Sequence, residues 1–457
     1  MERRFTLRKR QMLEECEVSV NVFRGMLERL KSFFGPFVEC LHQPAQQEHA
    51  GKYVSGLVSD LQRKNIESIA YRRDEDRQKL QHFIGAARWD HRPLVAVLVR
   101  DVGEELGENG GVIVFDPSAF PKKGTCSVGV ARQWCGRLGK VDNCQVAVTM
   151  GYVSRQDQAL VDLRLYLPKA WTGDPKRCQA AGVPQGVRYQ TRHAQALEML
   201  REHSESLPQA WIAGDDEMGT SACFRRDLHE MGETDFLAVP RTTTVRDLEV
   251  EPPPYSGRGA APKQSFGQMH RWRETLRPNA WRRIDVRDGE KGPLVIEPVA
   301  CRVQTKIKRR LMKYDETLVI IRCRDQGGVT KYDYYLSNAA VETPLEEFAR
   351  VSKAAHRIEE CIKRAKSEAG LADYEVRTWK GWHHHQTLSL IATWFLIVES
   401  RRGKKMDTCD HRAANPRRAG HAVAGRGWLQ HTRPDREEQN TQIETKRTST
   451  ILSLQNT

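Results

Sequence analysis

The feature that most constrains this sequence is the stretch GVIVFDPSAFPKK, residues 111–123, in which an apolar run meets the carboxylate of Asp116. A continuous apolar run is typical of a central strand that is buried on both faces. A charge beside such a strand is costly unless another group compensates it. The chain must therefore supply a partner for Asp116.

A second apolar run that ends in acid is WIAGDDEMG, residues 211–219. Two further runs, residues 145–153 and 159–168, flank the turn-like stretch SRQDQ and predict an antiparallel pair of strands. A helix is expected near residues 191–203. The predicted order is therefore strand, strand, strand, helix, strand, with carboxylates at the ends of the first and fourth strands.

This is the strand order of a ribonuclease-H-like sheet, in which the first and fourth strands are neighbours. Asp116 and Asp215 would then point at one spot, and we predict that a divalent cation lies between them. Carboxylate oxygens suit Mg²⁺ or Mn²⁺, and a glutamate on a later helix would complete a site for two ions about 3.5–4 Å apart. Two aspartates that merely cap turns or helices are an alternative of equal weight, and the pattern alone does not choose the glutamate.

The rest of the α/β chain divides into regions of different character. Residues 1–95 are predicted to be a helical domain, residues 96–235 the first part of the core, and residues 236–340 a β-rich insert outside the first sheet. Residues 341–400 are expected to return to the core as helices, and residues 401–457 to form a basic, poorly folded tail.

Apolar residues at helical spacing predict helices around residues 23–34, 54–69 and 76–86 of the N-terminal region. Basic residues are interleaved with them, as in LQRKN and YRRDEDRQK. A DNA-binding domain fits this pattern, and a solvated helix face fits it equally well.

The insert contains a Pro/Gly-rich loop, EPPPYSGRGAAP at residues 251–262, which no helix or central strand would hold. Two strands are expected around the DGEKG turn at residues 288–292, and a hairpin around residues 326–328. A helix is then predicted from about residue 345 to 369, since Gly370 suits a C-terminal cap.

The formal net charge of +14 and the isoelectric point of about 9.3 favour a polyanionic partner, most simply nucleic acid. A soluble protein that is merely basic is the alternative. No apolar run approaches the ~20 residues of a membrane span. The N-terminal stretch MERRFTLRKRQ lacks the apolar segment of a secretory signal, so no membrane partner is expected.

Four blocks of sequence carry a resemblance to a known family: FDPSAFPKKG, SVGVARQWCGRLGKVDNCQVAV, WIAGDDEMG and HRIEECIKRAKSEAGLADYEVRTWKGWHHHQTLSL. In this order they resemble the DDE transposases of bacterial insertion sequences, in the group with a β-insert before the catalytic glutamate. The resemblance runs from about residue 15 to 400. It implies a ribonuclease-H-like catalytic core with a helical N-terminal domain and a β-rich insertion.

The resemblance also implies an activity. Transposases of this group cleave transposon ends and transfer the 3′-hydroxyl strand to target DNA. The implied cofactor is Mg²⁺, for which Mn²⁺ can substitute, and the implied partners are the terminal inverted repeats, target DNA and a second copy of the chain. The implied location is the cytoplasm, on the nucleoid. A related metal-dependent DNA nuclease and a catalytically inert DNA-binding protein derived from a transposase are the alternatives.

The family pattern falls on particular residues of this chain. Its first aspartate is Asp116, its second is Asp215 with the adjacent Asp216 as an alternative, and its glutamate is Glu359. Lys366 lies seven positions after Glu359 on the same helix face, and the resemblance implies that it contacts a DNA phosphate.

The sequence departs from the family signature in several places. Ser352 and Ala355 stand where the wider family carries Tyr and Arg, so Arg350 or Arg357 is the alternative phosphate contact. Pro117 stands where many relatives carry a further aspartate. The predicted tail also does not resemble the family's last helical segment, which puts the activity of this copy in question.

Basic residues after the first acidic strand are further candidates for contact with DNA. The stretch 122–143 predicts contacts with the phosphate backbone from Lys122, Lys123, Arg132 and Lys140, with a solvated loop as the alternative.

Aromatic and histidine runs supply the last candidates. Trp272 and Trp281 lie in the basic insert segment HRWRETLRPNAWRR, and in similar enzymes an insert tryptophan stacks on a flipped base during hairpin formation. A tryptophan that only packs is commoner. The run His383–His385 suggests a metal site, but three adjacent helical residues cannot face one ion, so core or interface histidines are predicted.

Overall fold

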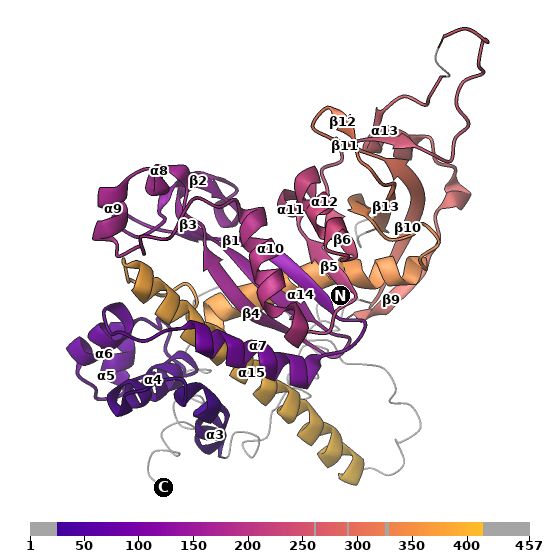
Figure 1. Cartoon of the computed structure of the whole chain (residues 1–457). Coiled ribbons are helices and arrows are strands. Elements are labelled where there is room, and N and C mark those ends of the chain that lie inside the picture. The colour runs from indigo at the N-terminus through magenta and orange to yellow at the C-terminus, as the bar shows by residue number, and fades with distance from the viewer. Residues whose placement is uncertain (1–24, 260–261, 290–291, 325–328, 415–457) are drawn as a thin grey trace.

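The computed structural model describes residues 25–259, 262–289, 292–324 and 329–414. The first predicted helix begins outside these ranges, and so do the hairpin turn predicted at residues 326–328 and the tail from residue 415 onward. Figure 1 shows a group of helices at one side of the molecule, a central sheet, and a β-rich end at the other side. The fold is therefore mixed α/β with a large central sheet, which agrees with the predicted class.

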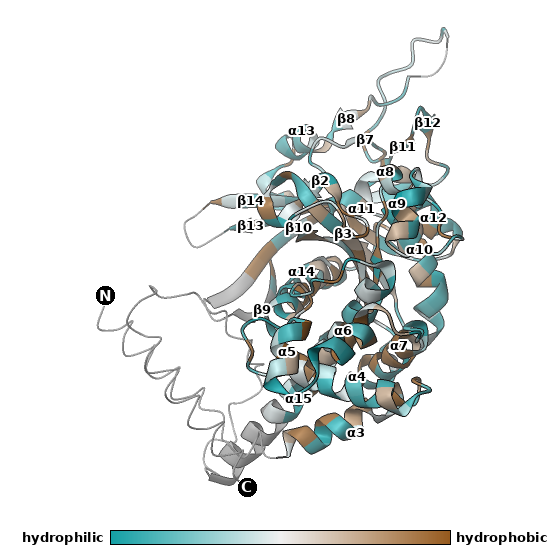
Figure 2. Cartoon of the chain, turned by 90° about the vertical axis from the view of Figure 1, so that its left-hand side faces the viewer, coloured by the Kyte–Doolittle hydropathy of each residue, from teal (hydrophilic) through white to brown (hydrophobic). Residues whose placement is uncertain are grey.

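The described N-terminal region is helical. Leu30, Phe34 and Phe37 bury one face of the first described helix, and Asp76 caps a later one by accepting from the Gln78 backbone N–H at 2.8 Å. Figure 2 shows hydrophilic and hydrophobic residues mixed along these helices, as in amphipathic helices that pack on a core. The helices are α3 (Met26–Val38), α4 (Pro44–Leu57), α5 (Ile66–Arg72), α6 (Arg77–Gly85) and α7 (Arg92–Leu106).

The helix predicted over residues 54–69 is wrong, because an irregular segment separates α4 from α5. The Lys64 ammonium donates to the Leu57 carbonyl at 2.7 Å and holds that segment. Asn65 then starts α5, since its side chain accepts from the Ser68 backbone N–H at 2.8 Å. The apolar residues on both sides of the break face one core, so their spacing alone predicted a single helix.

Helix α7 was not predicted from the sequence, because its run LVAVLV is apolar without a polar face. Pro93 stands at its first turn, where the missing N–H costs nothing. Leu94, Leu98 and Val102 are buried along it. The helical region therefore extends past residue 95, where the sequence placed its end.

One sheet of twelve described strands runs through the molecule in the order β2-β3-β1-β5-β6-β14-β13-β10-β7-β8, with β4 paired to β3 and β9 to β10. Its first half comprises β1 (Val112–Pro121), β2 (Ala131–Cys135), β3 (Lys140–Val153), β4 (Gln158–Leu165), β5 (Trp211–Gly214) and β6 (Asp235–Ala238). Its second half comprises β7 (Thr244–Asp247), β8 (Gly267–Gln268), β9 (Ile284–Gly289), β10 (Gly292–Gln304), β13 (Glu316–Arg324) and β14 (Thr330–Ser337).

Short helices and one small ribbon connect these strands. The helix predicted near residues 191–203 is confirmed, and Thr191 caps it by accepting from the Ala194 backbone N–H at 3.1 Å. The connecting helices are α8 (Lys169–Thr172), α9 (Pro175–Ala180), α10 (Arg192–His203), α11 (Asp216–Thr220), α12 (Ala222–Glu230) and α13 (Met269–Glu274). A separate two-stranded ribbon consists of β11 (Lys306–Ile307) and β12 (Arg310–Leu311).

Strand β1 lies between β3, with which it is antiparallel, and β5, with which it is parallel. The predicted pairs of β3 with β4 and of β1 with β5 are thereby confirmed. The prediction that β1 ends at Asp116 is wrong, because β1 continues to Pro121. Pairing with β3 persists along the whole strand, whereas β5 stops pairing at Gly214. Asp116 therefore marks the end of the neighbouring strand rather than of its own.

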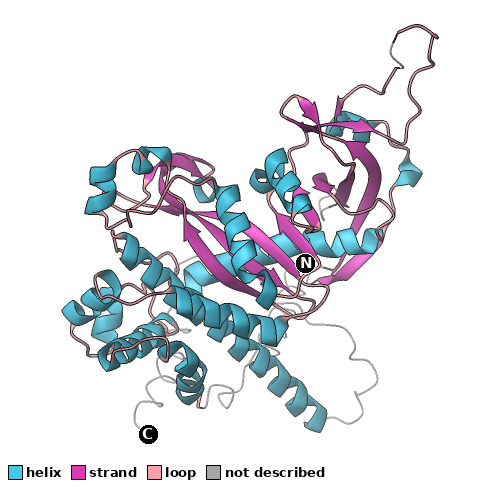
Figure 3. Ribbon diagram, in the orientation of Figure 1, coloured by secondary structure: helices cyan, strands magenta, loops and turns pink. Residues whose placement is uncertain are grey.

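The β-rich insert is not separate from the first sheet, contrary to the sequence-based prediction. Its last strand, β14, pairs with β6 through Tyr335↔Ala238 and Leu336↔Leu237. A buried edge on β6 needs a partner for its backbone groups, and β14 supplies it. The strands of the insert then continue the same sheet, as Figure 3 shows in magenta.

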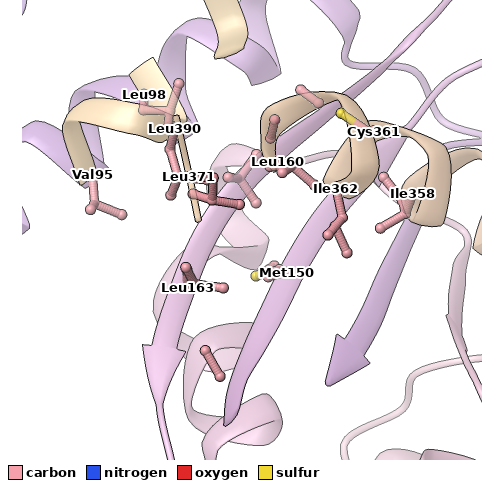
Figure 4. Packing of buried hydrophobic residues seen from close by; sticks show 14 of the residues in the cluster. Val95, Leu98, Met150, Leu160, Leu163, Ile358, Cys361, Ile362, Leu371 and Leu390 are labelled. Carbon is pink, nitrogen blue, oxygen red and sulfur yellow. The ribbon is translucent and has the colours of Figure 1, made fainter. Parts of the chain in front are cut away.

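Two long helices, α14 (Leu345–Glu368) and α15 (Trp379–Ala414), pack on the first half of the sheet. Figure 4 shows their buried residues meeting those of α7, β3 and β4. The predicted end of α14 is confirmed, since Gly370 follows it with a φ of +69°. Helix α15 continues past the predicted start of the tail, where the Arg402 guanidinium pairs with Glu399 at 3.0 Å.

The run His383–His385 lies in α15 and is buried, as predicted for core histidines. The His385 Nδ1 is 2.7 Å from the hydroxyl of Tyr53 on α4. Burial lowers the pKa of each of the three imidazoles. Within the described residues, no helix combines the length and apolarity that a membrane crossing requires.

Candidate active site

The sheet register brings Asp116 and Asp215 together. Phe115 on β1 pairs with Gly214, the last residue of β5, and each of them is followed by an aspartate: Asp116 within β1 and Asp215 just after β5. Asp215 also caps α11, because its carboxylate accepts from the Met218 backbone N–H at 3.1 Å. Asp215, the predicted partner of Asp116, is thus its neighbour in the fold. Asp215 also caps a helix, which was the alternative role.

The electrostatics of the pair show that the two carboxyl groups interact. Burial raises the pKa of Asp116 to about 8, and the nearby charges of Asp215 and Glu359 add to the effect. Burial raises the pKa of Asp215 to about 7, with a further contribution from Glu217. Asp216 is exposed, and its charge adds to the rise in the pKa of Asp215. The geometry therefore favours Asp215 over Asp216 as the partner.

Helix α14 carries Glu359 to the same place. A side chain at Gly151 of β3 would collide with Ile358, so the glycine lets α14 lie directly on the sheet beside the acids. The Glu359 carboxylate raises the pKa of Asp116, yet it is exposed and lies 3.8 Å from His356. Within the described residues, no three His, Cys, Asp or Glu side chains are grouped closely enough to hold a metal ion.

A buried hydroxyl beside Asp116 tests whether the acid pair suits a cation. Thr149 on β3 stands directly opposite Asp116, so their side chains share one face of the sheet. Its hydroxyl is buried and has no hydrogen-bond partner among the described residues. A buried donor of this kind normally has an acceptor. An ionised Asp116 beside a divalent cation would be that acceptor, so the aspartate pair fits such a cation.

Lys366 on α14 contacts Ser118, which lies two residues after Asp116 on the same face of β1. Its ammonium donates to the Ser118 hydroxyl at 2.7 Å and to the Ala119 carbonyl at 3.2 Å, and it packs over the Phe120 ring. Burial lowers the pKa of Lys366 to about 8, while the charge of Asp116 opposes that change. The structure therefore places this predicted phosphate contact next to the first acid.

Sequence reasoning missed Glu217 and Arg192. Glu217 is the third acid of the run after β5, and its carboxylate forms a two-pronged ion pair with the Arg192 guanidinium at 2.8 Å. The charge of Glu217 raises the pKa of both Asp116 and Asp215. The signal was present, because the sequence DDE following an apolar strand contains a third carboxylate. The sequence did not indicate that Arg192 on α10 would be the ion-pair partner of Glu217.

The predicted phosphate contacts after β1 differ in position. Lys123, Arg132 and Lys140 are exposed, and Lys140 pairs with Asp142 at 3.1 Å. Lys122 instead turns inward, since its ammonium donates to the Tyr374 carbonyl at 2.9 Å. The stretch is not a plain loop, because it forms β2 and the start of β3.

The tryptophans of the insert are engaged in packing. The Trp272 Nε1 donates to the Asp247 carboxylate at 2.7 Å, and the ring packs against the core of the insert. Trp281 packs on Tyr332, and the Arg322 guanidinium lies 4.5 Å from its ring centroid. In this structure both rings have partners within the chain.

The alternative arginines on α14 also have partners within the chain. Arg350 donates to the Glu347 carboxylate at 2.6 Å, and Arg357 donates to the Ser154 carbonyl at 2.6 Å. Ser352, which replaces the family tyrosine, donates to the Ala349 carbonyl at 2.8 Å.

Comparison with known proteins gives the class of this molecule. Residues 36–293, more than half of the chain, match the family described as DDE superfamily endonuclease, and the chain belongs to that family. Asp116 and Asp215 lie inside the matched range, whereas Glu359 lies beyond it. The resemblance found in the sequence is thereby confirmed.

The chain is similar to a probable transposase for insertion sequence element IS701 from Microchaete diplosiphon, with 36% identity over 103 residues. The match covers 22% of this chain and 27% of the relative, so it spans about a quarter of the relative's length.

Proposed function

We propose that this chain is a DNA transposase that cleaves transposon ends and transfers the 3′-hydroxyl strand to target DNA. The observation that carries the proposal is the pair Asp116 and Asp215, one within β1 and the other directly after the parallel strand β5, with both carboxyl pKa values raised. Paired carboxylates with raised pKa values are a recurrent feature of catalytic sites. Membership in a family of endonucleases supports the reaction class.

We infer a ribonuclease-H-like core from the strand order. Strands β4, β3 and β1 are antiparallel neighbours, and β5 and β6 extend the sheet parallel to β1. This is the order expected from the sequence. In it, Asp116 lies on the central strand, and α14 crosses the face on which the acids gather.

The proposed chemistry assigns a task to each residue. Asp116 and Asp215 would hold Mg²⁺ or Mn²⁺, and Glu359 would complete the ligand set by leaving His356. Such bound ions lower the pKa of a water or a 3′-hydroxyl and stabilise the leaving oxygen in phosphodiester displacement. Lys366 would meet a phosphate oxygen beside the acids, because its ammonium already lies next to Asp116.

The proposed substrates are the terminal inverted repeats and the target DNA. Lys123, Arg132 and Lys140 are exposed on the segment from the end of β1 to the start of β3 and would contact the phosphate backbone. We further propose that two copies act together on paired ends, in the cytoplasm at the nucleoid.

Several observations favour a second candidate, an inert DNA-binding protein derived from a transposase. Glu359 is exposed and paired with His356, and the described residues contain no three-ligand group. The family signature is also altered at Ser352 and Ala355. A metal-dependent nuclease without strand transfer is the related alternative.

The deciding experiment is strand cleavage of DNA that carries the terminal repeats flanking this coding sequence, with Mg²⁺ or Mn²⁺. Asp116→Ala and Glu359→Gln should abolish cleavage and keep DNA binding. Glu360→Gln is the matched control, because Glu360 neighbours Glu359 on α14 and contacts the same His356 at 3.3 Å. Tight end binding without cleavage by the unaltered chain would instead support the inert reading, and cleavage without joining would support the nuclease.

A further inference from the structure

We propose that Arg225 is a positioning residue for the acid site, because its buried ion pair with Glu316 ties helix α11 and Asp215 to the β-rich insert. This inference rests on the proposed function, since it concerns the placement of an acid to which that function assigns a cation. Arg225 would act through α11 and not on the DNA.

The Arg225 guanidinium joins two parts of the chain. Arg225 lies on α12 with a side chain that is 3% exposed, and its Nε donates to the Glu316 carboxylate at 2.7 Å. Its Nη1 donates to the carbonyl of Gly219 in α11. Glu316 is the first residue of β13 in the insert, and it also accepts from the Thr305 hydroxyl. One side chain therefore connects α11 with a strand of the insert.

Helix α11 carries this connection to Asp215. The Asp215 carboxylate accepts from the Met218 backbone N–H at 3.1 Å, and the Asp215 carbonyl accepts from the Gly219 N–H at 3.0 Å. Gly219 also lies directly on β6, where a side chain would collide with the Ala238 carbonyl. A shift of Gly219 would therefore move Asp215, because a single helical turn joins the two residues.

The insert end of the connection is attached to the core. Thr317, next to Glu316, pairs with Ser337 on β14, and the Ser337 hydroxyl donates to the Asp235 carbonyl on β6. Helix α12 contacts both β6 and β11 (Figure 1). Burial and the charge of Glu316 raise the pKa of Asp235, and the charge of Arg225 opposes them. Arg225 is therefore the cation that two buried carboxyl groups share at this junction.

A buried ion pair of this kind is better suited to define one arrangement than to stabilise the fold. Apolar side chains of similar volume are often as stabilising as a buried pair, whereas removal of one partner leaves an unpaired charge. The bond from Arg225 to the Gly219 carbonyl neutralises no charge, yet it fixes the place of α11. The pair therefore serves the placement of α11.

The insert contains a second ion pair that serves as a matched control. The Arg322 guanidinium donates to the Glu297 carboxylate at 2.7 Å, the same distance as between Arg225 and Glu316. Glu297 and Arg322 stand opposite each other on β10 and β13, so this pair joins two strands of the insert. Loss of either pair disturbs the insert, but only loss of the Arg225 pair should reach α11.

The test measures amide hydrogen exchange in peptides that span α11, without metal or DNA, and compares them with peptides from β3. The same proteins are then assayed for the Mn²⁺ concentration that gives half-maximal cleavage of terminal-repeat DNA. The main variant is the double substitution Arg225→Met with Glu316→Leu, which leaves neither partner as an unpaired charge. Arg225→Lys keeps the charge without the forked guanidinium, and Glu297→Gln is the control.

We expect exchange in α11 to rise about tenfold in the double variant with β3 unchanged, because the bonds to Asp215 persist only while α11 is held. The Mn²⁺ requirement should rise roughly tenfold, the usual effect of losing a residue that orients a metal ligand. Arg225→Lys should fall between the double variant and the unaltered chain. Glu297→Gln should match the unaltered chain in both measurements.

Unchanged exchange in α11, or an equal rise in β3, would overturn the positioning role, because the pair would then serve only general stability. Faster exchange in α11 with an unaltered Mn²⁺ requirement would overturn it as well, since the reaction would not depend on the placement of α11. If the double variant does not fold, Arg225→Lys decides by the same two measurements. If the unaltered chain cleaves no terminal-repeat DNA, the proposed function fails, and the exchange measurement still decides whether Arg225 holds α11.

Discussion

The acid pair and the core of the insert both contain residues that the sequence marked for function, and the two regions differ in what those residues do. Asp116 and Asp215 meet because two adjacent parallel strands are in register at Phe115 and Gly214. Trp272, in contrast, is tied to Asp247 in the core of the insert. A site built from strand ends can be located from strand order, whereas the task of a lone aromatic depends on partners that strand order does not give.

The largest predicted effect is a loss of cleavage rate when the acid pair is altered, and it would test the contrast between the acid pair and the insert. Asp215→Asn should lower the rate of strand cleavage at least a thousandfold, because a neutral amide cannot replace a cation-binding carboxylate. The fold should survive, since asparagine caps a helix as well as aspartate does. Cleavage of terminal-repeat DNA with Mg²⁺ measures the effect.

The matched control for that variant is Asp216→Asn, which alters the adjacent exposed acid. We expect its cleavage rate to stay within tenfold of the unaltered chain. The opposite result, with Asp216→Asn inactive and Asp215→Asn active, would transfer the proposed ligand role to Asp216 and show that the strand register misleads at this point.

The next effect concerns the insert and is a change in stability. Trp272→Ala should lower the free energy of unfolding by about 3 kcal/mol, because it removes packing and the hydrogen bond to Asp247. Trp272→Phe should cost about 1 kcal/mol, the usual value of one such bond. Urea denaturation measures both. A loss of cleavage by Trp272→Phe without any loss of stability would instead place Trp272 on the DNA.

The parts of the fold that could be predicted from the sequence are those that carry a local signal, and the parts that could not depend on residues far apart in sequence. Strands β1 and β5, helix α10 and the end of α14 each carry a local signal, such as an apolar run, a capping Thr191 or the left-handed Gly370. The pairing of β14 with β6 has no local signal, because the register of Tyr335 with Ala238 is set by residues far apart in sequence. The break before Asn65 was hidden because the apolar spacing continues across it.

The residues of the candidate site also differ in whether the sequence could place them. Asp116, Asp215 and Lys366 could be placed because they lie at fixed positions on a strand, a strand end and a helix face. The ion pair between Arg192 and Glu217 could not be, since nothing in the sequence joins α10 to the turn after β5. Exposure also cannot be read from residue type, so the sequence did not distinguish Trp134 from the packed tryptophans.

A third prediction concerns the junction between the two regions and its dependence on pH. Burial, together with the charge of Glu316, raises the pKa of Asp235 to about 8. An unfolded aspartate titrates near 3.9, so between about pH 4 and pH 8 the folded chain keeps a proton that the unfolded chain has released. Stability therefore falls as pH rises through this window, by at most about 1.4 kcal/mol per pH unit for this one group.

Asp235→Asn should flatten that slope, because an amide has no proton to lose. The Asn338 backbone N–H donates to Asp235 at 2.7 Å, and the amide oxygen can accept the same bond. Urea midpoints at pH 6, 7 and 8 for both proteins give the comparison, with roughly 2 kcal/mol less pH dependence expected in the variant. Parallel curves for the two proteins would show that Asp235 is ionised in the fold.

The smallest predicted effect concerns Thr149, where a change in the Mn²⁺ requirement for cleavage is expected without a loss of stability. Thr149→Val replaces a buried hydroxyl, unpartnered among the described residues, with a methyl group of similar shape. Because that hydroxyl makes no bond in the fold, the variant should be as stable as the unaltered chain or slightly more stable. If the hydroxyl supports Asp116 beside a cation, cleavage by Thr149→Val should need about tenfold more Mn²⁺ for half-maximal rate. Thr149→Ser keeps the donor and should restore the original requirement. A shared loss of stability and of Mn²⁺ response would show instead that Thr149 serves packing, as Trp272 is expected to do in the insert.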